Sequence, residues 1–115
     1  MVLDPQDQRA VRDAVLDLAG ATLVVSWPGR VLLASGEQRV SVSHFQGDEG
    51  SVLGDVWSRI DPGYAPDGPT ARFLLGGQLV DHALRYTVPA AEAAHVVLQA
   101  LQRGLWQDAL WEKQP

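Results

Sequence analysis

The chain of 115 residues has no cysteine and no asparagine, and Lys113 is its only lysine. Without cysteine it has no disulfide and no thiolate ligand for a metal, and without asparagine it has no acceptor for N-linked glycans. The formal net charge is −5. This charge disfavours binding to a phosphate backbone, which needs clustered lysine and arginine, so we expect no direct nucleic-acid ligand.

Long apolar runs are absent as well. No run approaches the length that spans a bilayer, and residues 1–20 carry four aspartates, which argues against a secretory or transit peptide. We therefore expect a cytoplasmic protein with no membrane partner. A chain of this length buries roughly two-thirds of its unfolded surface, so residues 1–115 should form a single domain, and we expect a monomer.

The motifs of common catalytic and metal sites are missing too. The sequence has no glycine-rich phosphate loop, no G-x-S-x-G, no H-E-x-x-H and no pair of histidines at metal-ligand spacing. We expect no enzymatic activity, no metal and no cofactor. A site assembled from distant residues stays geometrically open, because the histidines fall on separate predicted elements, at His44, His82 and His95.

What is present includes a clear hairpin signal in residues 70–89, which should form the centre of a sheet. A Gly-Gly pair separates two runs rich in Leu, Val, Phe, Tyr and Thr, and paired glycines suit the positive φ angles of hairpin turns. Alternation along the second strand places His82 on the core face, where the simplest interpretation is a neutral histidine bonded to a carbonyl or hydroxyl. Asp81 and Arg85 would then face solvent or a partner.

Residues 21–46 predict three further strands, joined by short turns that make neighbouring strands antiparallel. In the third of these strands Arg39, Ser41 and Ser43 share one face, so we expect that face of the sheet to be solvated. His44 ends the strand, either as a surface residue or in an interaction at the loop junction.

Helices are predicted near both ends of the chain. The first begins at Asp4-Pro5, with Asp4 as the N-cap, and stops at Gly20. The last begins at Pro89 and stops at Gly104, and the tail after it is apolar enough to pack back on the domain. The fold class is therefore α+β: an antiparallel sheet of about five strands, a meander plus a hairpin, with both helices on one face. The apolar stripes of the helices are Val11, Ala14, Val15 and Leu18 in the first and Ala94, Val97, Leu98 and Leu101 in the last.

Most of the negative charge falls in residues 47–70, where five acidic residues face Arg59 alone. Apolar side chains at helical spacing in residues 51–60 predict a short helix or turn that covers a sheet edge, with Trp57 more simply a core residue than an exposed one. Tyr64 follows in a loop rich in Gly and Pro, with no periodic reason to be buried. An aromatic side chain in an acidic loop is typical of a binding surface, although a purely solvated loop is the alternative.

From the hairpin onward the chain resembles the immunity protein family numbered one of bacterial polymorphic toxin systems. The resemblance covers residues 73–111 and depends on the order and spacing of four pieces rather than on any one motif. These pieces are a strand with a Gly-Gly turn, a Val-Pro entry to an Ala-rich helix, a Gly that stops the helix, and a Trp near the C-terminus. Here they are Phe73-Leu74-Leu75-Gly76-Gly77-Gln78, Val88-Pro89-Ala90-Ala91-Glu92-Ala93, Arg103-Gly104 and Trp111-Glu112.

The resemblance implies an intracellular antitoxin that binds a toxin domain, a nucleic-acid-directed deaminase or nuclease, and blocks it without chemistry of its own. An acidic surface with aromatic side chains suits the basic cleft of such a toxin. The alternative is a non-catalytic ligand-binding or secretion-adaptor domain, which a large apolar pocket would favour. On the first hypothesis the expected partner-binding residues are Asp48, Glu49, Asp55, Trp57, Asp61, Tyr64 and Asp67.

Overall fold

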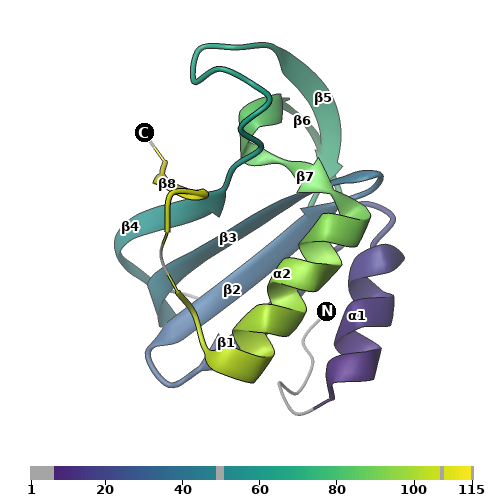
Figure 1. Cartoon of the computed structure of the whole chain (residues 1–115). Coiled ribbons are helices and arrows are strands. Elements are labelled where there is room, and N and C mark those ends of the chain that lie inside the picture. The colour runs from purple at the N-terminus through teal and green to yellow at the C-terminus, as the bar shows by residue number, and fades with distance from the viewer. Residues whose placement is uncertain (1–6, 49–50, 107, 115) are drawn as a thin grey trace.

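The structure, a computed structural model, describes residues 7–48, 51–106 and 108–114 and has the predicted α+β architecture. Its main antiparallel sheet has the strand order β1-β2-β3-β4-β8, and the short strand β7 joins the same sheet by pairing with β3. Both helices lie on one face of the sheet (Figure 1). The elements are α1 (Gln8–Leu16), β1 (Thr22–Trp27), β2 (Arg30–Gly36), β3 (Arg39–Asp48), β4 (Ser51–Arg59), β5 (Thr70–Leu75), β6 (Gln78–Ala83), the 3-10 turn η1 (Leu84–Tyr86), β7 (Val88–Pro89), α2 (Ala90–Arg103) and β8 (Trp111–Lys113).

Helix α1 carries its N-cap at Asp7, whose carboxylate accepts a hydrogen bond from the amide of Ala10 at 3.1 Å. The predicted N-cap Asp4 and the following Pro5 lie outside the described residues. The predicted apolar stripe is confirmed, since three of its members are fully buried and the fourth packs partly buried against the core: Val11, Val15 and Leu18, then Ala14.

Gly20 is not the stop of α1, because the helix already ends at Leu16 with Asp17 as its C-cap. Gly20 instead has φ +87, and a Cβ there would collide with the side chain of Leu74 from β5. Its carbonyl accepts a hydrogen bond from the amide of Gly77 at 3.1 Å. A glycine is needed at this position because the hairpin β5–β6 approaches the backbone closely.

The predicted meander of three strands is confirmed as β1, β2 and β3, paired antiparallel in sequence order. Side chains on the helix-facing side of these strands join α1 and α2 in one buried core. On that side Val25 lies opposite Leu32, and Leu32 lies opposite His44 in the next strand. The buried core residues of the three strands are Leu23, Val25, Leu32, Ala34, Val40 and Val42.

The other face of the sheet is not solvated as predicted. Ser58 on β4 is fully buried, Ser43 is 9% exposed, and Phe45 is 3% exposed. Residues from the loop after β4 and from segment 84–87 reach over this face: Arg39 bonds to Asp61 and Thr87. The prediction failed because it treated the sheet as the outermost layer, whereas later segments return to cover it.

The segment predicted as a short helix or turn instead forms the strand β4, Ser51–Arg59. β4 pairs with β3, but the register shifts after Phe45: Phe45 lies opposite Val56, while Gln46 lies opposite Leu53. The two extra residues in β4 form a bulge in which Gly54 has φ +84. The bulge interrupts the alternation of the strand, which explains why its apolar residues fall at helical spacing.

The predicted hairpin is confirmed, but it is not the centre of the sheet. β5 and β6 form a separate sheet of two strands. Gly76 and Gly77, with φ +58 and +81, make the turn, as the Gly-Gly pair predicts. The amide of Gly76 donates to the hydroxyl of Ser35 at 2.9 Å, so the turn of the hairpin is tied to the end of β2 in the main sheet.

Helix α2 begins at Ala90, one residue after the predicted start, because Pro89 is its N-cap and not its first residue, and it ends as predicted before Gly104, its C-cap. The tail after it returns to the sheet as β8, which pairs with β4. Trp111 in β8 is 4% exposed and belongs to the core, which confirms that the tail packs on the domain. Among the described residues, neither helix has the length and apolar character needed to cross a membrane.

Candidate partner-binding surface

Strand β4 separates the predicted contact residues into groups at its two ends. Because two of its residues form the bulge, β4 runs beside residues 43–48 of β3 and spans about 20 Å. Asp48 is exposed at the end of β3, beside the start of β4, whereas residues 60–69 follow the other end of β4 and form a loop (Figure 1). Glu49 lies outside the described residues. The predicted acidic segment is therefore not one continuous surface.

Asp55 and Trp57 lie within β4, between these two groups. Asp55 is exposed, and its carboxylate lies 4.0 Å from the ammonium of Lys113 in β8. Trp57 is half-buried and packs against the core, and it lies opposite His44 on one side and Lys113 on the other. Trp57 is thus a core residue, which was the simpler of the two interpretations.

The loop of residues 60–69 is folded around Asp61. One oxygen of its carboxylate accepts from the amide of Gly63 at 3.0 Å, and the other accepts from the guanidinium of Arg39 at 2.7 Å. Its carbonyl accepts from the amide of Tyr64 at 3.1 Å, and its amide donates to the carbonyl of Arg85 at 2.7 Å. The hydrogen bond from Arg39 is the largest cause that lowers the pKa of Asp61, so its charge is held in the folded protein.

Tyr64 is fixed by the same two arginines. The guanidinium carbon of Arg39 lies 5.4 Å from the centre of the Tyr64 ring, a cation–π distance. The Tyr64 carbonyl accepts a hydrogen bond from Arg85 at 2.6 Å. The ring is half-buried and not a freely exposed loop aromatic. Asp67, further along the loop, is exposed.

The alternation predicted that Arg85 faces solvent or a partner. Its side chain is instead only 15% exposed and pairs with Glu112 of β8. Two guanidinium nitrogens of Arg85 donate to one Glu112 oxygen at 3.2 and 2.8 Å, and the hydroxyl of Tyr86 donates to the other at 2.8 Å. These bonds raise the pKa of Arg85 and lower the pKa of Glu112. The second strand of the predicted hairpin ends at Ala83, so alternation no longer applies at Arg85. Asp81, which was also placed on that face, is exposed.

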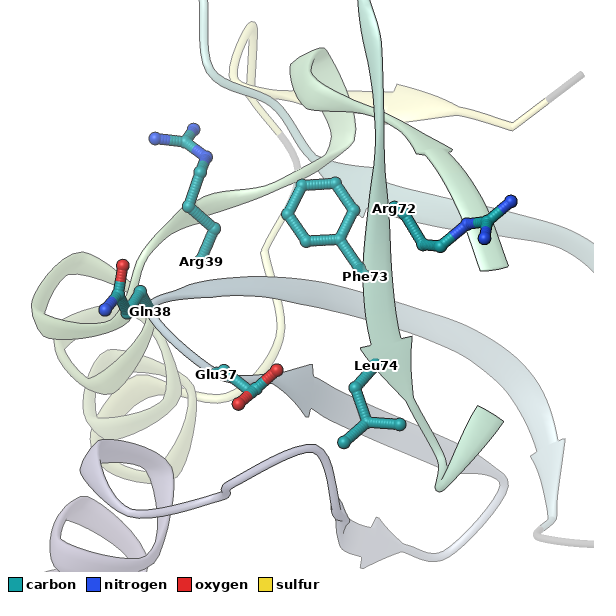
Figure 2. Close-up of a pocket in the computed structure, with 6 residues that line it drawn as sticks. All are labelled: Glu37, Gln38, Arg39, Arg72, Phe73 and Leu74. Carbon is teal, nitrogen blue, oxygen red and sulfur yellow. The ribbon is translucent and has the colours of Figure 1, made fainter. Parts of the chain in front are cut away.

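Arg39 of β3 contacts the loop and also lines a neighbouring cavity of about 380 Å³. Its Nε donates to the hydroxyl of Thr87 at 2.8 Å, and one of its terminal nitrogens donates to the Thr87 carbonyl at 2.9 Å. Figure 2 shows the ring of Phe73 pointing into the space between β5 and Arg39, while Arg72 points to the other side of β5. The residues that line the cavity are Glu37, Gln38, Arg39, Arg72, Phe73 and Leu74.

The local charge excess of residues 47–70 is smaller in the structure than the sequence window suggests. Cations from outside the window pair with two of its acids: Arg39 with Asp61, and Lys113 with Asp55. A count along the chain cannot include these partners, which come from other strands. Of the acidic residues expected at the surface of the loop, Asp67 is the exposed one.

The described residues hold no group of three His, Asp or Glu side chains that could bind a metal ion. His44 is buried and not at the surface as predicted: it is 3% exposed, and its ring lies 4.7 Å from that of Trp111. Burial, together with the positive charge of Arg30, lowers the pKa of His44 to about 4. Burial also lowers the pKa of the half-buried His82. His95 is exposed on α2.

The residues that organise the loop were not recognised in the sequence as a set. Arg39, Arg85 and Glu112 lie on three elements, and no periodicity relates them. The one feature of the sequence that could have indicated these three residues is that each is a charged residue in a short strand-like run of mostly apolar or small residues. Such a charge usually needs a partner when its strand is covered. The sequence could not say which acid pairs with which arginine.

Comparisons with known proteins give no match to this chain, either among family models, among curated proteins or among solved structures.

Proposed function

We propose that this chain is an immunity protein that binds and neutralises a toxin domain of a bacterial polymorphic toxin system. The toxin is a nucleic-acid-directed deaminase or nuclease, and the immunity protein occludes its active site as a monomer in the cytoplasm, without catalysis. The resemblance over residues 73–111 suggests the family. The contact surface that the geometry favours is the loop of residues 60–69.

The observation that carries this proposal is that the loop is held in one conformation before any partner arrives. Arg39 and Arg85, from separate elements, fix Asp61 and Tyr64 from two sides. Ordering a flexible segment on binding costs about 0.5–1.5 kcal/mol for each immobilised side chain. A loop that is already ordered avoids much of this cost, which is the property that a tight inhibitor needs.

Charge and shape support a basic protein partner. The chain has a net charge of −5, and Asp67 is exposed on the loop. An enzyme that acts on nucleic acid presents a positive cleft to the phosphates, so an acidic loop is complementary to it. The cavity beside Arg39 offers a place next to the loop where a partner side chain can contact the Phe73 ring.

The test is to capture the tagged chain with its partner from the native host, identify the partner by mass spectrometry, and assay the purified partner. We expect a deaminase or nuclease whose activity is abolished by an equimolar amount of this chain. A secretion adaptor would bind its partner and leave the activity unchanged. A domain that binds only a small ligand would capture no such enzyme, and either result would contradict the proposal.

A further inference from the structure

A second cavity, of about 320 Å³, lies between β4 and the C-terminal end of α2. It is lined by Arg59 of β4, by Gln99 and Arg103 of α2, and by Trp106 and Asp108 of the following segment. This volume falls at the lower end of the range of small-molecule sites. The cavity shares no lining residue with the loop of residues 60–69.

Arg59 is the unusual member of this cavity, because two of its three guanidinium nitrogens are buried without a hydrogen-bond acceptor among the described residues. It is 8% exposed, and among the described residues its buried Nε and one terminal nitrogen have no hydrogen-bond partner. The carboxylate of Asp108 lies 3.8 Å from the same terminal nitrogen, which is too long for a hydrogen bond. Asp108 uses its oxygens to accept from Trp106 Nε1 at 2.9 Å and from the Leu110 amide at 2.8 Å.

Stacking on aromatic rings does not by itself satisfy this guanidinium. Arg59 lies 5.8 Å from the centre of the Trp106 ring and 5.6 Å from that of Trp111, both within cation–π range. Stacking uses the faces of the guanidinium, whereas its N–H groups lie in its plane and still need acceptors. Buried donors without acceptors are rare in native proteins, and a missing ligand is one of the few physical explanations.

The unsatisfied groups around Arg59 form a cluster. Both ring nitrogens of His44 and Nε1 of Trp111 are buried without a hydrogen-bond partner in the described part of the chain. The rings of His44 and Trp111 lie 4.7 Å apart, and those of Trp111 and Trp106 lie 5.7 Å apart. Several buried polar groups among the described residues thus lack hydrogen-bond partners in one place, which is typical of a functional site.

We propose that this cavity binds a small molecule that carries a carboxylate or phosphate group, with the oxyanion accepting hydrogen bonds from Arg59 and Arg103. The lining contains two guanidinium groups, of Arg59 and Arg103, and one carboxylate, of Asp108, so it favours one negative charge. The carbonyls at the end of α2 oppose an anion, but this effect is weaker than direct hydrogen bonds from guanidinium groups. The Trp106 ring can contact an apolar or planar part of the same ligand, and the amide of Gln99 adds a donor and an acceptor.

The test uses benzoate, its neutral analogue benzamide, and inorganic phosphate as probes of the full chain. The indole N–H signals of Trp106 and Trp111 are followed by NMR during titration. We expect saturable binding of benzoate in the millimolar range and binding of benzamide that is about tenfold weaker or absent, because it lacks the charge. Phosphate that binds as well as benzoate would show that the oxyanion alone suffices. If neither anion shifts the indole signals, or if benzamide binds like benzoate, the proposal is wrong.

Four variants test which residues hold the anion. Arg59→Gln should weaken benzoate binding about tenfold, Arg103→Gln should weaken it by a smaller factor, and Asp108→Asn should strengthen it by removing the competing charge. Arg72→Gln, at an exposed arginine paired with Asp81 on the hairpin, is the matched control and should bind as the parent chain does. If Arg59→Gln does not fold, the opposite effects of Arg103→Gln and Asp108→Asn decide the outcome. Unchanged affinity in both of these variants would overturn the proposal.

Discussion

At the scale of single residues, His44 makes the stability of the fold depend on pH. Its pKa is lowered from 6.5 in the unfolded chain to about 4 in the folded protein. Between these values the unfolded state binds more protons than the folded state, so the free energy of unfolding falls as the pH is lowered from 6.5 towards 4. The loss at about pH 4.5, relative to pH 7, should be about 2 kcal/mol.

The variant His44→Phe keeps a ring against Trp111 but cannot titrate. We expect urea unfolding to show a smaller difference between pH 7 and about pH 4.5 for this variant than for the parent chain, by about 2 kcal/mol. His95→Gln, at an exposed position of α2, controls for the loss of an imidazole. An equal pH dependence in the parent chain and in His44→Phe would show that His44 is not a buried neutral group.

The burial of His44 could not be predicted from its neighbours in the sequence. Alternation correctly places it on the same face as Val40 and Val42, which are both buried. Its predicted position at the end of a polar strand nevertheless indicated the surface. The residue that covers it is Trp111, from the far end of the chain. His44 lies inside β3, which continues to Asp48, and not at the end of the strand as predicted. Local patterns predict faces, whereas burial depends on which distant segment covers the face.

At the scale of elements, the loop of residues 60–69 should lose its order when Arg39 is replaced. Arg39→Gln removes a charged hydrogen bond to Asp61 and the ring contact with Tyr64. We expect a loss of about 2 kcal/mol in unfolding free energy, since hydrogen bonds to charged groups contribute about 1.5–3 kcal/mol. Hydrogen exchange of the amides of Gly63 and Tyr64 should become faster.

Arg72→Gln is the matched control for this prediction, because it also removes an arginine that pairs with one aspartate. The pair of Arg72 and Asp81 is 3.7 Å apart and exposed on both sides, so its loss should change stability by less than about 0.5 kcal/mol. If both variants lose the same stability and the loop amides exchange at the parent rate, the arginine does not organise the loop.

The C-terminal strand β8 is a second element whose contribution can be measured. Trp111 is 4% exposed and contacts His44 and Trp106 through their rings. Trp111→Ala should lower the unfolding free energy by about 3–5 kcal/mol, as for other buried large side chains. Thermal or urea unfolding measures this loss. An unchanged melting temperature would mean that the tail is exposed and available for binding.

Elements whose ends are set by local chemistry were the ones that the sequence could predict. Helix α2 is bounded by Pro89 and Gly104, and the hairpin turn is made by Gly76-Gly77 with positive φ at both positions. β4 was wrongly predicted as a helix or turn because the bulge at Gly54 removes the alternation that marks a strand. The loop was correctly placed on the chain, but the arginines that fix it come from distant elements and left no local pattern.

At the scale of the whole molecule, the negative charge is spread along β4 and not gathered in one surface. Asp48 and Asp67 are both exposed and carry the same charge, but Asp48 lies beside the start of this strand and Asp67 follows its end. The strand spans about 20 Å, whereas electrostatic interactions in physiological salt are screened over about 8 Å. A partner that binds the loop will therefore sense Asp67 and not Asp48. This difference makes the position of the contact measurable.

The last prediction uses this pair of residues against the cognate toxin. At about 0.15 M salt, Asp67→Asn should lower the association rate by a factor of about two to three, and the matched control Asp48→Asn should leave it unchanged. Tyr64→Ala should instead raise the dissociation rate, because it removes an aromatic contact and the ring that Arg39 holds. Leu53→Ala is its control: it removes exposed apolar surface at the other end of β4 and should have no effect on the dissociation rate. Surface plasmon resonance at two salt concentrations separates the two rates. Equal effects of Asp48→Asn and Asp67→Asn in physiological salt would place the contact away from this loop, because screening prevents a distant charge from changing the association rate as much as a near one does. Unchanged rates for both Asp67→Asn and Tyr64→Ala would lead to the same conclusion.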